Sequence, residues 1–258
     1  MEPPNQYSQV TDPNWWQPFF EGPFGRLQIG GAYEQKASEE VDQITSWLNL
    51  PSGAKILDAP SGDGRIAREL ARRDYRVVAV DFNPRVLERG RALAHGLPVE
   101  FTIGDIRELS FEGEFDAVIS WFTSYGYFDD AGNLQYLEGL ARALKPGGRL
   151  VIDLHVAEGI YTFVHPWGWQ EFQTDEGAIR VLEHRWLDLE AGRLVADWTF
   201  LFKDREHHQQ SSIRIPTYRD LVKDLRHLGF TSFDAYERPS GKPFKLGSPR
   251  LCLVAQKP

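Results

Sequence analysis

The sequence predicts an α/β fold: a doubly wound, mostly parallel seven-stranded sheet with an antiparallel C-terminal edge strand, plus an inserted small antiparallel β-sheet. Two observations carry this prediction. Between residues 54 and 154, short apolar runs alternate with segments of helical spacing, which is typical of parallel strands joined by right-handed crossovers. Within residues 157–215, apolar residues recur at every second position of the segment 192–203, which indicates an antiparallel strand of an inserted sheet.

The chain has 258 residues, a length that fits one large domain with an inserted part. We divide it into four segments. These are an aromatic N-terminal arm or lid (1–36), a ligand-binding core (37–156), an inserted antiparallel β lid (157–215) and a C-terminal part that completes the core sheet (216–258).

The bulk composition excludes several classes of protein. A formal net charge of −8 argues against a nucleic-acid partner bound by general phosphate attraction. The single cysteine, Cys252, excludes an intrachain disulfide and a four-thiolate zinc site, and we see no ligand set for a metal. No signal peptide or membrane-spanning run is evident, so we expect a cytoplasmic protein without a membrane partner; the oligomeric state is unknown.

The first elements are an arm and a helix. The arm is rich in Pro and Gly but also in aromatic rings, which we expect to pack over the main domain; anchoring is favoured over ligand contact. A helix then starts at an N-cap, Ser38. Val41, Ile44 and Leu48 form its buried stripe, and Pro51–Gly53 ends it.

The core then alternates strands and helices. Asn83 followed by Pro84 predicts a helix start, and further helices follow Gly64 and run from about 131 to 144. Lys145–Gly148 is expected to form a turn into the fifth strand. The expected strands cover residues 55–58, 76–81, 99–105, 115–121 and 149–154.

The second half contains the inserted sheet and the end of the core. Strands are expected around 178–188 and 192–203, and His207-His208 is assigned to a solvated polar hairpin. Thr217 is predicted to cap a helix that ends at Gly229. Two last strands, around 230–237 and 251–256, are expected to form the antiparallel edge.

A glycine-bearing turn follows the first strand. Glycine lets the backbone adopt angles closed to other residues, and in such sheets ligands bind outside the carboxyl ends of the strands. The spacing Gly62-x-Gly64-x-x-Ala67, with Asp81 coming 19 positions after Gly62 (81 − 62), matches a dinucleotide fingerprint. By itself the turn suits either a dinucleotide or S-adenosyl-L-methionine.

Acidic residues end three neighbouring strands. Asp58, Asp81 and Asp105 follow the first, second and third strands. A carboxylate directly before the turn would repel a diphosphate, whereas three acids around one crevice suit a cation that carries a ribose and an adenine. The alternative is that each acid caps the turn that follows it.

At this point the chain resembles the class I S-adenosylmethionine-dependent methyltransferases of the small-molecule type, which have a Rossmann-like fold. The matching motifs are Ile56-Leu-Asp-Ala-Pro-Ser-Gly-Asp-Gly64, Val78-Ala-Val-Asp81, Gly104-Asp105-Ile106, Phe115-Asp-Ala-Val-Ile119 and Leu144-Lys-Pro-Gly-Gly148. They occur in the family's order and cover about residues 54–154. The resemblance makes residues 37–156 the S-adenosylmethionine-binding core.

The resemblance implies a role for each cofactor-binding residue. The loop from Asp58 through Ala59, Pro60 and Gly62 to Gly64 would hold the methionine part. Asp81 would accept the ribose hydroxyls, Phe82 would pack on the adenine, Gly104, Asp105 and Ile106 would hold the adenine, and Trp121 would lie near the methyl group. Pro60 departs from the family, which usually has glycine there, and a proline offers no backbone N–H.

The implied reaction is an in-line displacement that moves a methyl group to an N or O nucleophile of a small molecule and leaves S-adenosyl-L-homocysteine. His155 is the candidate general base, with a structural hydrogen-bonding role as the alternative; Tyr125, Tyr127 and Asp153 are weaker candidates. Trp121–Ser124 lacks the Asn/Asp-Pro-Pro-Tyr/Phe signature of adenine or glutamine methylation, which favours a small-molecule acceptor.

Two other functions stay open from the sequence. An NAD(P)-dependent oxidoreductase of Rossmann fold is suggested by the fingerprint at Gly62. A catalytically silent S-adenosylmethionine-binding protein is suggested by Pro60 and by the absence of a certain base.

Overall fold

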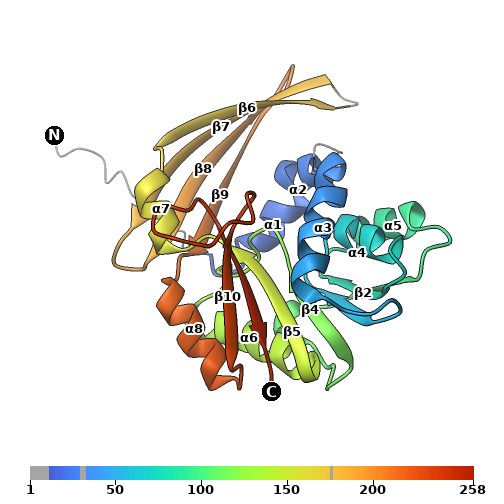
Figure 1. Cartoon of the computed structure of the whole chain (residues 1–258). Coiled ribbons are helices and arrows are strands. Elements are labelled where there is room, and N and C mark those ends of the chain that lie inside the picture. The colour runs from blue at the N-terminus through green and yellow to red at the C-terminus, as the bar shows by residue number, and fades with distance from the viewer. Residues whose placement is uncertain (1–11, 30–32, 175–176) are drawn as a thin grey trace.

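A computed structural model of the chain describes residues 12–29, 33–174 and 177–258. Two sheets are present in these residues (Figure 1): a seven-stranded sheet in the order β10-β11-β5-β4-β1-β2-β3, and a four-stranded sheet in the order β6-β7-β8-β9. β10 and β11 are antiparallel to each other, and β11 is antiparallel to β5, whereas the other neighbours in the large sheet are parallel. The predicted fold class is confirmed.

The strands of the large sheet are β1 (Lys55–Asp58), β2 (Arg76–Asp81), β3 (Val99–Ile103), β4 (Phe115–Ser120), β5 (Leu144–Leu154), β10 (Ser232–Glu237) and β11 (Leu251–Gln256). The small sheet contains β6 (Trp167–Thr174), β7 (Gly177–Asp188), β8 (Arg193–Leu201) and β9 (Glu206–Arg214). The helices are α1 (Trp16–Glu21), α2 (Pro23–Ile29), α3 (Ala37–Leu48), α4 (Arg65–Ala71), α5 (Pro84–Leu93), α6 (Asp130–Ala143), α7 (Ala157–Phe163) and α8 (Tyr218–His227), with short 3₁₀ turns η1 (Glu34–Lys36) and η2 (Ile106–Glu108).

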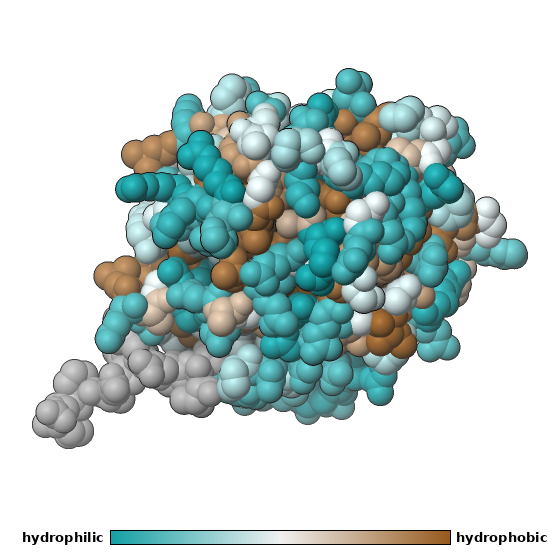
Figure 2. Space-filling model, turned by 90° about the horizontal axis from the view of Figure 1, so that it is seen from below, coloured by the Kyte–Doolittle hydropathy of each residue, from teal (hydrophilic) through white to brown (hydrophobic). Residues whose placement is uncertain are grey.

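Helices cover both faces of the large sheet. Successive residues of a strand point to opposite faces, so Ile56 packs in the cluster formed with α3, α4 and α5, and Leu57 in the cluster formed with α6 and α8. The inner strands β1, β2, β4 and β11 are therefore mostly apolar and buried. All five parallel strands end at one edge of the sheet, and the inserted sheet lies beyond that edge (Figure 1). The opposite end of the molecule is largely hydrophilic, with hydrophobic residues in small separate groups (Figure 2).

The arm is folded against both sheets. Residues 1–11 and 30–32, which belong to the predicted arm, lie outside the described residues. Trp15 and Phe19 are buried in the main core, and the Trp15 indole donates to the Tyr127 carbonyl at 3.1 Å. From the small sheet, the Gln209 amide donates to the Pro18 carbonyl at 2.9 Å. The arm is thus held between the core and the inserted sheet.

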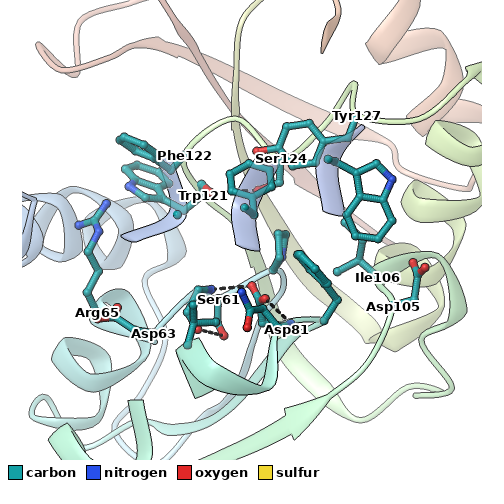
Figure 3. Close-up of a pocket in the computed structure, with 18 of the residues that line it drawn as sticks. Ser61, Asp63, Arg65, Asp81, Asp105, Ile106, Trp121, Phe122, Ser124 and Tyr127 are labelled. Atoms are coloured by element: carbon teal, nitrogen blue, oxygen red, sulfur yellow. Dashed lines mark hydrogen bonds between the residues drawn. The ribbon is translucent and has the colours of Figure 1, made fainter. Parts of the chain in front are cut away.

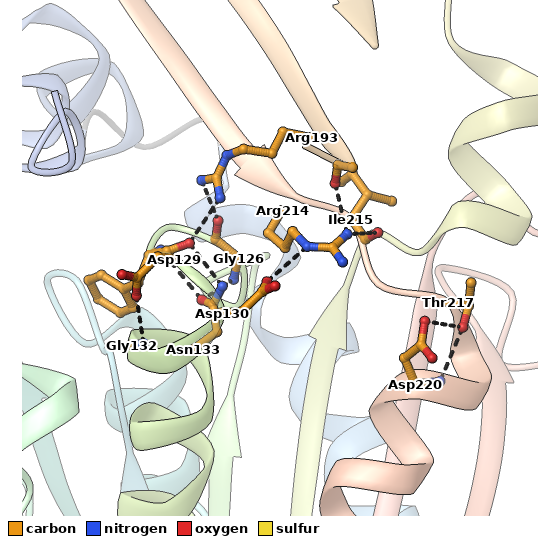
Figure 4. A network of polar contacts seen from close by, with 12 residues as sticks. Gly126, Asp129, Asp130, Gly132, Asn133, Arg193, Arg214, Ile215, Thr217 and Asp220 are labelled. Atoms are coloured by element: carbon orange, nitrogen blue, oxygen red, sulfur yellow. Dashed lines mark hydrogen bonds and ion pairs between the residues drawn. The ribbon is translucent and has the colours of Figure 1, made fainter. Parts of the chain in front are cut away.

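A polar network joins the inserted sheet to the loop between β4 and α6 (Figure 4). Arg193 donates to the Phe128 carbonyl at 3.0 Å and to the Gly126 carbonyl at 3.1 Å. Arg214 donates to the Asp130 carboxylate at 3.0 Å. Each arginine therefore ties a strand of the small sheet to the segment that leads from the core sheet into α6.

Local signals predicted some helix boundaries and missed others. Asn83 accepts from the Arg85 amide and Thr217 from the Asp220 amide, so both predicted caps are confirmed. The prediction that Ser38 is the N-cap of α3 is wrong. The turn η1 runs directly into α3, and the Ser38 hydroxyl instead accepts a hydrogen bond from Arg73 at 3.1 Å. α3 ends at Leu48, before the predicted proline, because Asn49 adopts a left-handed conformation with φ 46°.

Several elements were not predicted. The arm contains the short helices α1 and α2, and β6 and α7 have no strong pattern in the sequence. The polar sequence of β9 predicts a solvated hairpin, whereas it forms a strand. His207 and His208 lie within β9 and are exposed, paired in register with Phe200 and Thr199. The expected turn at Lys145–Gly148 is part of β5, where the register to β4 shifts between Phe115 and Ala117.

Tyr136 links α6 to the strand ends. Its buried hydroxyl donates to the Ala59 carbonyl at 3.0 Å and lies 2.6 Å from the Ser120 hydroxyl. We predict that Tyr136→Phe lowers the free energy of unfolding by about 1–3 kcal/mol, because it leaves buried acceptors unpaired. Urea denaturation tests this, with Tyr161→Phe as the control, since Tyr161 is exposed. Equal stability of the two variants would contradict the prediction.

Candidate functional site

A pocket lies at the edge where the parallel strands end. It has a charged side and an aromatic side (Figure 3). The charged side comes from the turns that follow β1, β2 and β3, and the aromatic side from the arm and from the loop that follows β4. The lining residues are Trp16, Phe20, Gly25, Tyr33, Pro60, Ser61, Gly62, Asp63, Arg65, Asp81, Phe82, Asn83, Val86, Asp105, Ile106, Trp121, Phe122, Ser124, Tyr127 and Phe128.

The turn after β1 is held from both neighbouring strands. Ala59 donates its backbone N–H to the Ile119 carbonyl at 3.0 Å, and Ser61 donates to the Val80 carbonyl at 2.8 Å. Gly62 has a φ of 57°, and a Cβ placed on it would have no atom within 4 Å. Glycine at this position therefore leaves open space in the pocket wall as well as allowing the left-handed turn.

Gly64 serves packing rather than the pocket. It starts α4 with a φ of 73°, and a Cβ there would come within 2.6 Å of the Phe101 ring. Gly64 does not line the pocket, and neither do Asp58, Ala59 and Gly104. The structure thus brings Pro60, Gly62, Asp81, Phe82, Asp105, Ile106 and Trp121 together around one cavity and leaves these four residues and His155 outside its lining.

Asp81 lies at the centre of the charged side. Its carboxylate accepts from the Gly62 N–H at 2.9 Å and from the Asn83 N–H at 3.0 Å, so it fixes the turns after β1 and β2 together. The side chain is buried, and this burial raises its pKa to about 6 against the opposing effect of these hydrogen bonds.

Asp105 has a different environment. β3 ends at Ile103, so Asp105 lies beyond the strand that it was expected to end, and its side chain caps η2 by accepting from the Arg107 N–H at 2.9 Å. The Arg107 guanidinium also binds both carboxylate oxygens. Although burial acts to raise the pKa of Asp105, its hydrogen bonds from Arg107 outweigh this and lower it. Asp105 therefore caps the turn that follows it, which was the alternative to a ligand-binding role, and it also lines the pocket.

Asp58 is the least satisfied of the three acids. It is buried at the end of β1, and among the described residues its Oδ2 atom has no hydrogen-bond partner. Burial raises its pKa to about 7, while the Arg65 charge opposes this. A buried, unpaired carboxylate oxygen is costly, and it marks this strand end as a place where a bound cation would be stabilised.

Apart from Trp121 and Tyr127, the residues of the aromatic side were not predicted from the sequence. Trp16 and Phe20 line the pocket, so the arm contributes to its wall in addition to being anchored. The Trp16 ring meets the Phe82 ring edge to face at 4.7 Å. The loop after β4 contributes Phe122, Ser124, Tyr127 and Phe128. The run of aromatics after the fourth strand was the signal available for these residues.

Arg65 also lines the pocket, and no pattern in the sequence indicated this. It follows Gly64 at the start of α4, and its guanidinium pairs with the Glu40 carboxylate of α3 and lies 5.7 Å from the Phe122 ring centroid. In Figure 3 its side chain extends towards Trp121 and Phe122. Together with Asp63, it places charges of both signs beside the glycine turn.

His155 lies just past β5, away from the pocket lining. Its Nδ1 atom is buried and has no hydrogen-bond partner among the described residues. Burial and the Arg250 charge lower its pKa to about 4, so the imidazole is neutral at pH 7. An imidazole with so low a pKa is a weak base, and Asp153 is likewise no free base because two arginines bind its carboxylate.

Two kinds of feature are absent from the described part of the chain. No group of three or more His, Cys, Asp or Glu side chains is arranged to hold a metal ion there. Across the same residues, no helix combines the length and apolarity needed to cross a membrane.

Comparison with known proteins identifies the core. Residues 56–148 match the family model described as "Methyltransferase domain". The putative methyltransferase YqeM of Bacillus subtilis (strain 168) is 32% identical over 119 residues, which are 44% of this chain and 48% of that protein. The chain spans about half the length of the first curated relatives that it matches.

Solved structures share the fold over most of the chain. An S-adenosylmethionine-dependent methyltransferase from Clostridium acetobutylicum has a TM-score of 0.72 at 19% identity, covering 86% of this chain and 91% of its own. The amino pentose methyltransferase CalS10 from Micromonospora echinaspora has a TM-score of 0.69 at 18% identity, covering 98% and 100%. Residues 56–148 therefore match a methyltransferase domain, and most of the chain has the same fold as solved S-adenosylmethionine-dependent methyltransferases.

Proposed function

We propose that this chain binds S-adenosyl-L-methionine in the pocket at the strand ends and transfers its methyl group to a nitrogen or oxygen atom of a small molecule. The observation that carries the proposal is the division of the pocket into a charged side, built from three strand-end turns, and an aromatic side opposite. The bound cofactor supplies a methyl group on a positively charged sulfur and leaves as S-adenosyl-L-homocysteine. The chain's own residues have to hold, align and desolvate the reactants.

The turns after β2 and β3 fit the adenosine half of the cofactor. The Asp81 carboxylate has about four acceptor positions and uses two for backbone N–H groups, so it retains capacity for two ribose hydroxyls. Phe82, backed by Trp16, and Ile106 offer apolar surface to an adenine ring. Asp105 is bound to Arg107, so we assign the adenine contact mainly to Ile106 and Phe82.

The turn after β1 fits the methionine half. The methionine half carries a positive ammonium group and a negative carboxylate. Asp63 and Arg65 line the pocket beside Gly62 and provide one negative and one positive side chain. We assign the carboxylate of the cofactor to Arg65 and its ammonium group to Asp63 in the pocket lining. The unpaired carboxylate oxygen of Asp58, buried behind the lining, adds its charge to this side of the pocket. Pro60 has no backbone N–H, and the Ala59 N–H is bound to the Ile119 carbonyl. We therefore propose that Ala59 and Pro60 only shape the turn.

The aromatic side fits the methyl acceptor. Trp121, Phe122 and Tyr127 exclude water from the space beside the charged turn, which strengthens the electrostatic interactions there. Burial raises the pKa of both Tyr33 and Tyr127, so their hydroxyls remain protonated at neutral pH and act as hydrogen-bond donors. Because His155 is a weak base outside the lining, we propose that alignment rather than proton removal is the chain's main contribution, which suits a neutral amine acceptor best.

The first prediction concerns the ligand itself. Isothermal titration of the purified chain should show binding of S-adenosyl-L-methionine and S-adenosyl-L-homocysteine and none of NAD. Binding of NAD without either adenosyl ligand would refute the proposal in favour of an oxidoreductase. Transfer of a radiolabelled methyl group to members of a panel of amines and phenols then tests catalysis, and binding without any transfer across the panel would support the catalytically silent alternative.

The second prediction concerns Asp81. Asp81→Asn should weaken S-adenosyl-L-homocysteine binding by about 1–3 kcal/mol, or about 5- to 150-fold in Kd, because a charged acceptor for buried hydroxyls is lost. Asp188→Asn is the matched control, since Asp188 also accepts from a backbone N–H, that of Ala191 at 2.9 Å, in a turn of the inserted sheet. Unchanged affinity in Asp81→Asn would remove this residue from the proposed site.

The third prediction concerns pH. The pKa of Asp58 is raised to about 7, so its protonated form is favoured in the folded chain below that pH. If the ionised carboxylate stabilises the ligand's ammonium group, affinity falls by up to about tenfold for each pH unit below 7. Titrations with S-adenosyl-L-homocysteine from pH 5.5 to 8 measure this, and Asp58→Asn should flatten the profile. A pH-independent affinity in the unmodified chain would exclude the Asp58 contribution.

The raised pKa of Asp58 has the opposite effect on the stability of the ligand-free chain. A raised folded-state pKa stabilises the fold fully below the unfolded pKa of about 4, and this contribution is lost as pH rises through about 7. Ligand affinity and ligand-free stability should therefore change in opposite directions between pH 4 and pH 7. In Asp58→Asn the change in stability should become smaller, and the part due to Asp81, whose pKa is also raised, should remain.

A further inference from the structure

The turn that carries Trp121 and Phe122 has an unusual backbone. Phe122 and Thr123, which are consecutive and not glycine, have φ values of 69° and 62°. A side chain with a Cβ is disfavoured in this left-handed region, so such a conformation persists only where surrounding contacts impose it. Trp121, Phe122 and Ser124 all line the pocket, so this conformation sets the shape of the pocket wall.

One residue binds the backbone of both strained positions. The Phe122 N–H donates to Oδ2 of Asp153 at 3.0 Å, and the Thr123 N–H donates to the Asp153 carbonyl at 3.0 Å. Asp153 is near the end of β5, beside β4, and its side chain is fully buried. Its main chain and side chain therefore hold the turn from the neighbouring strand.

Asp153 is itself fixed by two arginines. Arg250 donates to Oδ1 at 3.0 Å and to Oδ2 at 2.7 Å, and Arg238 donates to Oδ2 at 2.5 Å. Burial would raise the pKa of Asp153, but these charges outweigh it and lower the pKa, so the carboxylate is ionised at neutral pH. Arg250 also donates to the Thr123 hydroxyl, which ties the turn to the same cluster.

The cluster continues to the pocket wall. Glu40 of α3 pairs with both Arg238 and Arg65, and Arg65 lines the pocket. The guanidinium groups of Arg65, Arg238 and Arg250 lie 5.7, 5.5 and 5.5 Å from the Phe122 ring centroid. The Tyr33 ring packs against Phe122 from the arm at 4.9 Å. Phe122 is thus held both through its backbone and around its ring.

We propose that Asp153 is a positioning residue of the pocket, which holds Phe122 and Thr123 in their left-handed conformation and so fixes Trp121 and Phe122 as the wall against which the reacting groups align. The inference rests on the proposed function, because it takes S-adenosyl-L-homocysteine as a ligand of this pocket. Asp153 acts through the turn and does not contact the pocket itself.

The first test compares two aspartates in the full chain. Asp153→Asn should raise the Kd of S-adenosyl-L-homocysteine by about tenfold, because a small displacement of the wall is costly for alignment and binding. Asp116→Asn is the control: Asp116 also binds a backbone N–H, that of Lys55 at 2.8 Å, and a cation, Lys145 at 2.7 Å, but at the start of β4, away from the pocket. Its Kd should change by less than about twofold.

The second test addresses the strain directly. Thr123→Gly and Thr123→Ala both remove the hydroxyl, but only glycine adopts the left-handed conformation without a Cβ penalty. In the Asp153→Asn background, the glycine variant should bind S-adenosyl-L-homocysteine more tightly than the alanine variant by about fivefold, and with Asp153 present the two should differ by less than about twofold. This difference would not arise if Asp153 merely supported overall stability.

The outcomes separate the two proposals. If the unmodified chain does not bind S-adenosyl-L-homocysteine, the proposed function is refuted. If it binds but Asp153→Asn leaves the affinity unchanged, only the positioning role is overturned. The same holds if glycine and alanine at position 123 give equal affinity in the Asp153→Asn background. If circular dichroism shows that Asp153→Asn is unfolded, Arg250→Lys replaces it in both tests, since lysine keeps the charge but loses the bidentate contact with Asp153.

Discussion

The turn after β1 is fixed by the two strands that flank it, and the rest of the site depends on this restraint. Backbone N–H groups of Ala59 and Ser61 extend the hydrogen bonding of β1 towards β4 and β2, beyond the point where the strand ends. The Gly62 N–H is then bound by Asp81 at the end of β2. Parallel strands make this possible because their carboxyl ends meet at one edge, so a turn from one strand reaches the acceptors of the next.

Charge and apolar surface are separated across the pocket by the topology. The turns of the parallel strands carry the acids and Arg65, whereas the arm and the β4–α6 loop bring the rings. Burial raises the pKa of Asp81 in the pocket lining and of Asp58 behind it, so the ionised forms of these two acids are in an unfavourable environment in the ligand-free chain. A positively charged ligand would stabilise the ionised carboxylates. The burial that makes these carboxylates costly in the ligand-free chain would therefore also contribute to ligand affinity.

Sequence reasoning recovered features set by local chemistry and missed those set by distant contacts. The inner apolar strands, the Asn83 and Thr217 caps and the acids that end β1 and β2 follow from residues close together in the chain, whereas Asp105 lies beyond the end of β3. β9 could not be recognised, because its polar sequence becomes a strand only through pairing with β8. The left-handed turn at Phe122 was equally hidden, because β-branched Thr123 opposes it locally and Asp153, from another strand, imposes it. Arg65 gave no signal because Glu40 orients it from α3.

The anchoring of the arm, the inserted sheet and the β4–α6 loop to one another has a kinetic consequence. Trp15 of the arm binds the Tyr127 carbonyl, Gln209 of the sheet binds the Pro18 carbonyl, and Arg193 of the sheet binds the Phe128 carbonyl. Each segment is thus bonded to the other two, so none can swing aside as an independent flap. We therefore expect the residence time of a ligand bound beneath them to depend on the joint rupture of these bonds rather than on the opening of a single hinge.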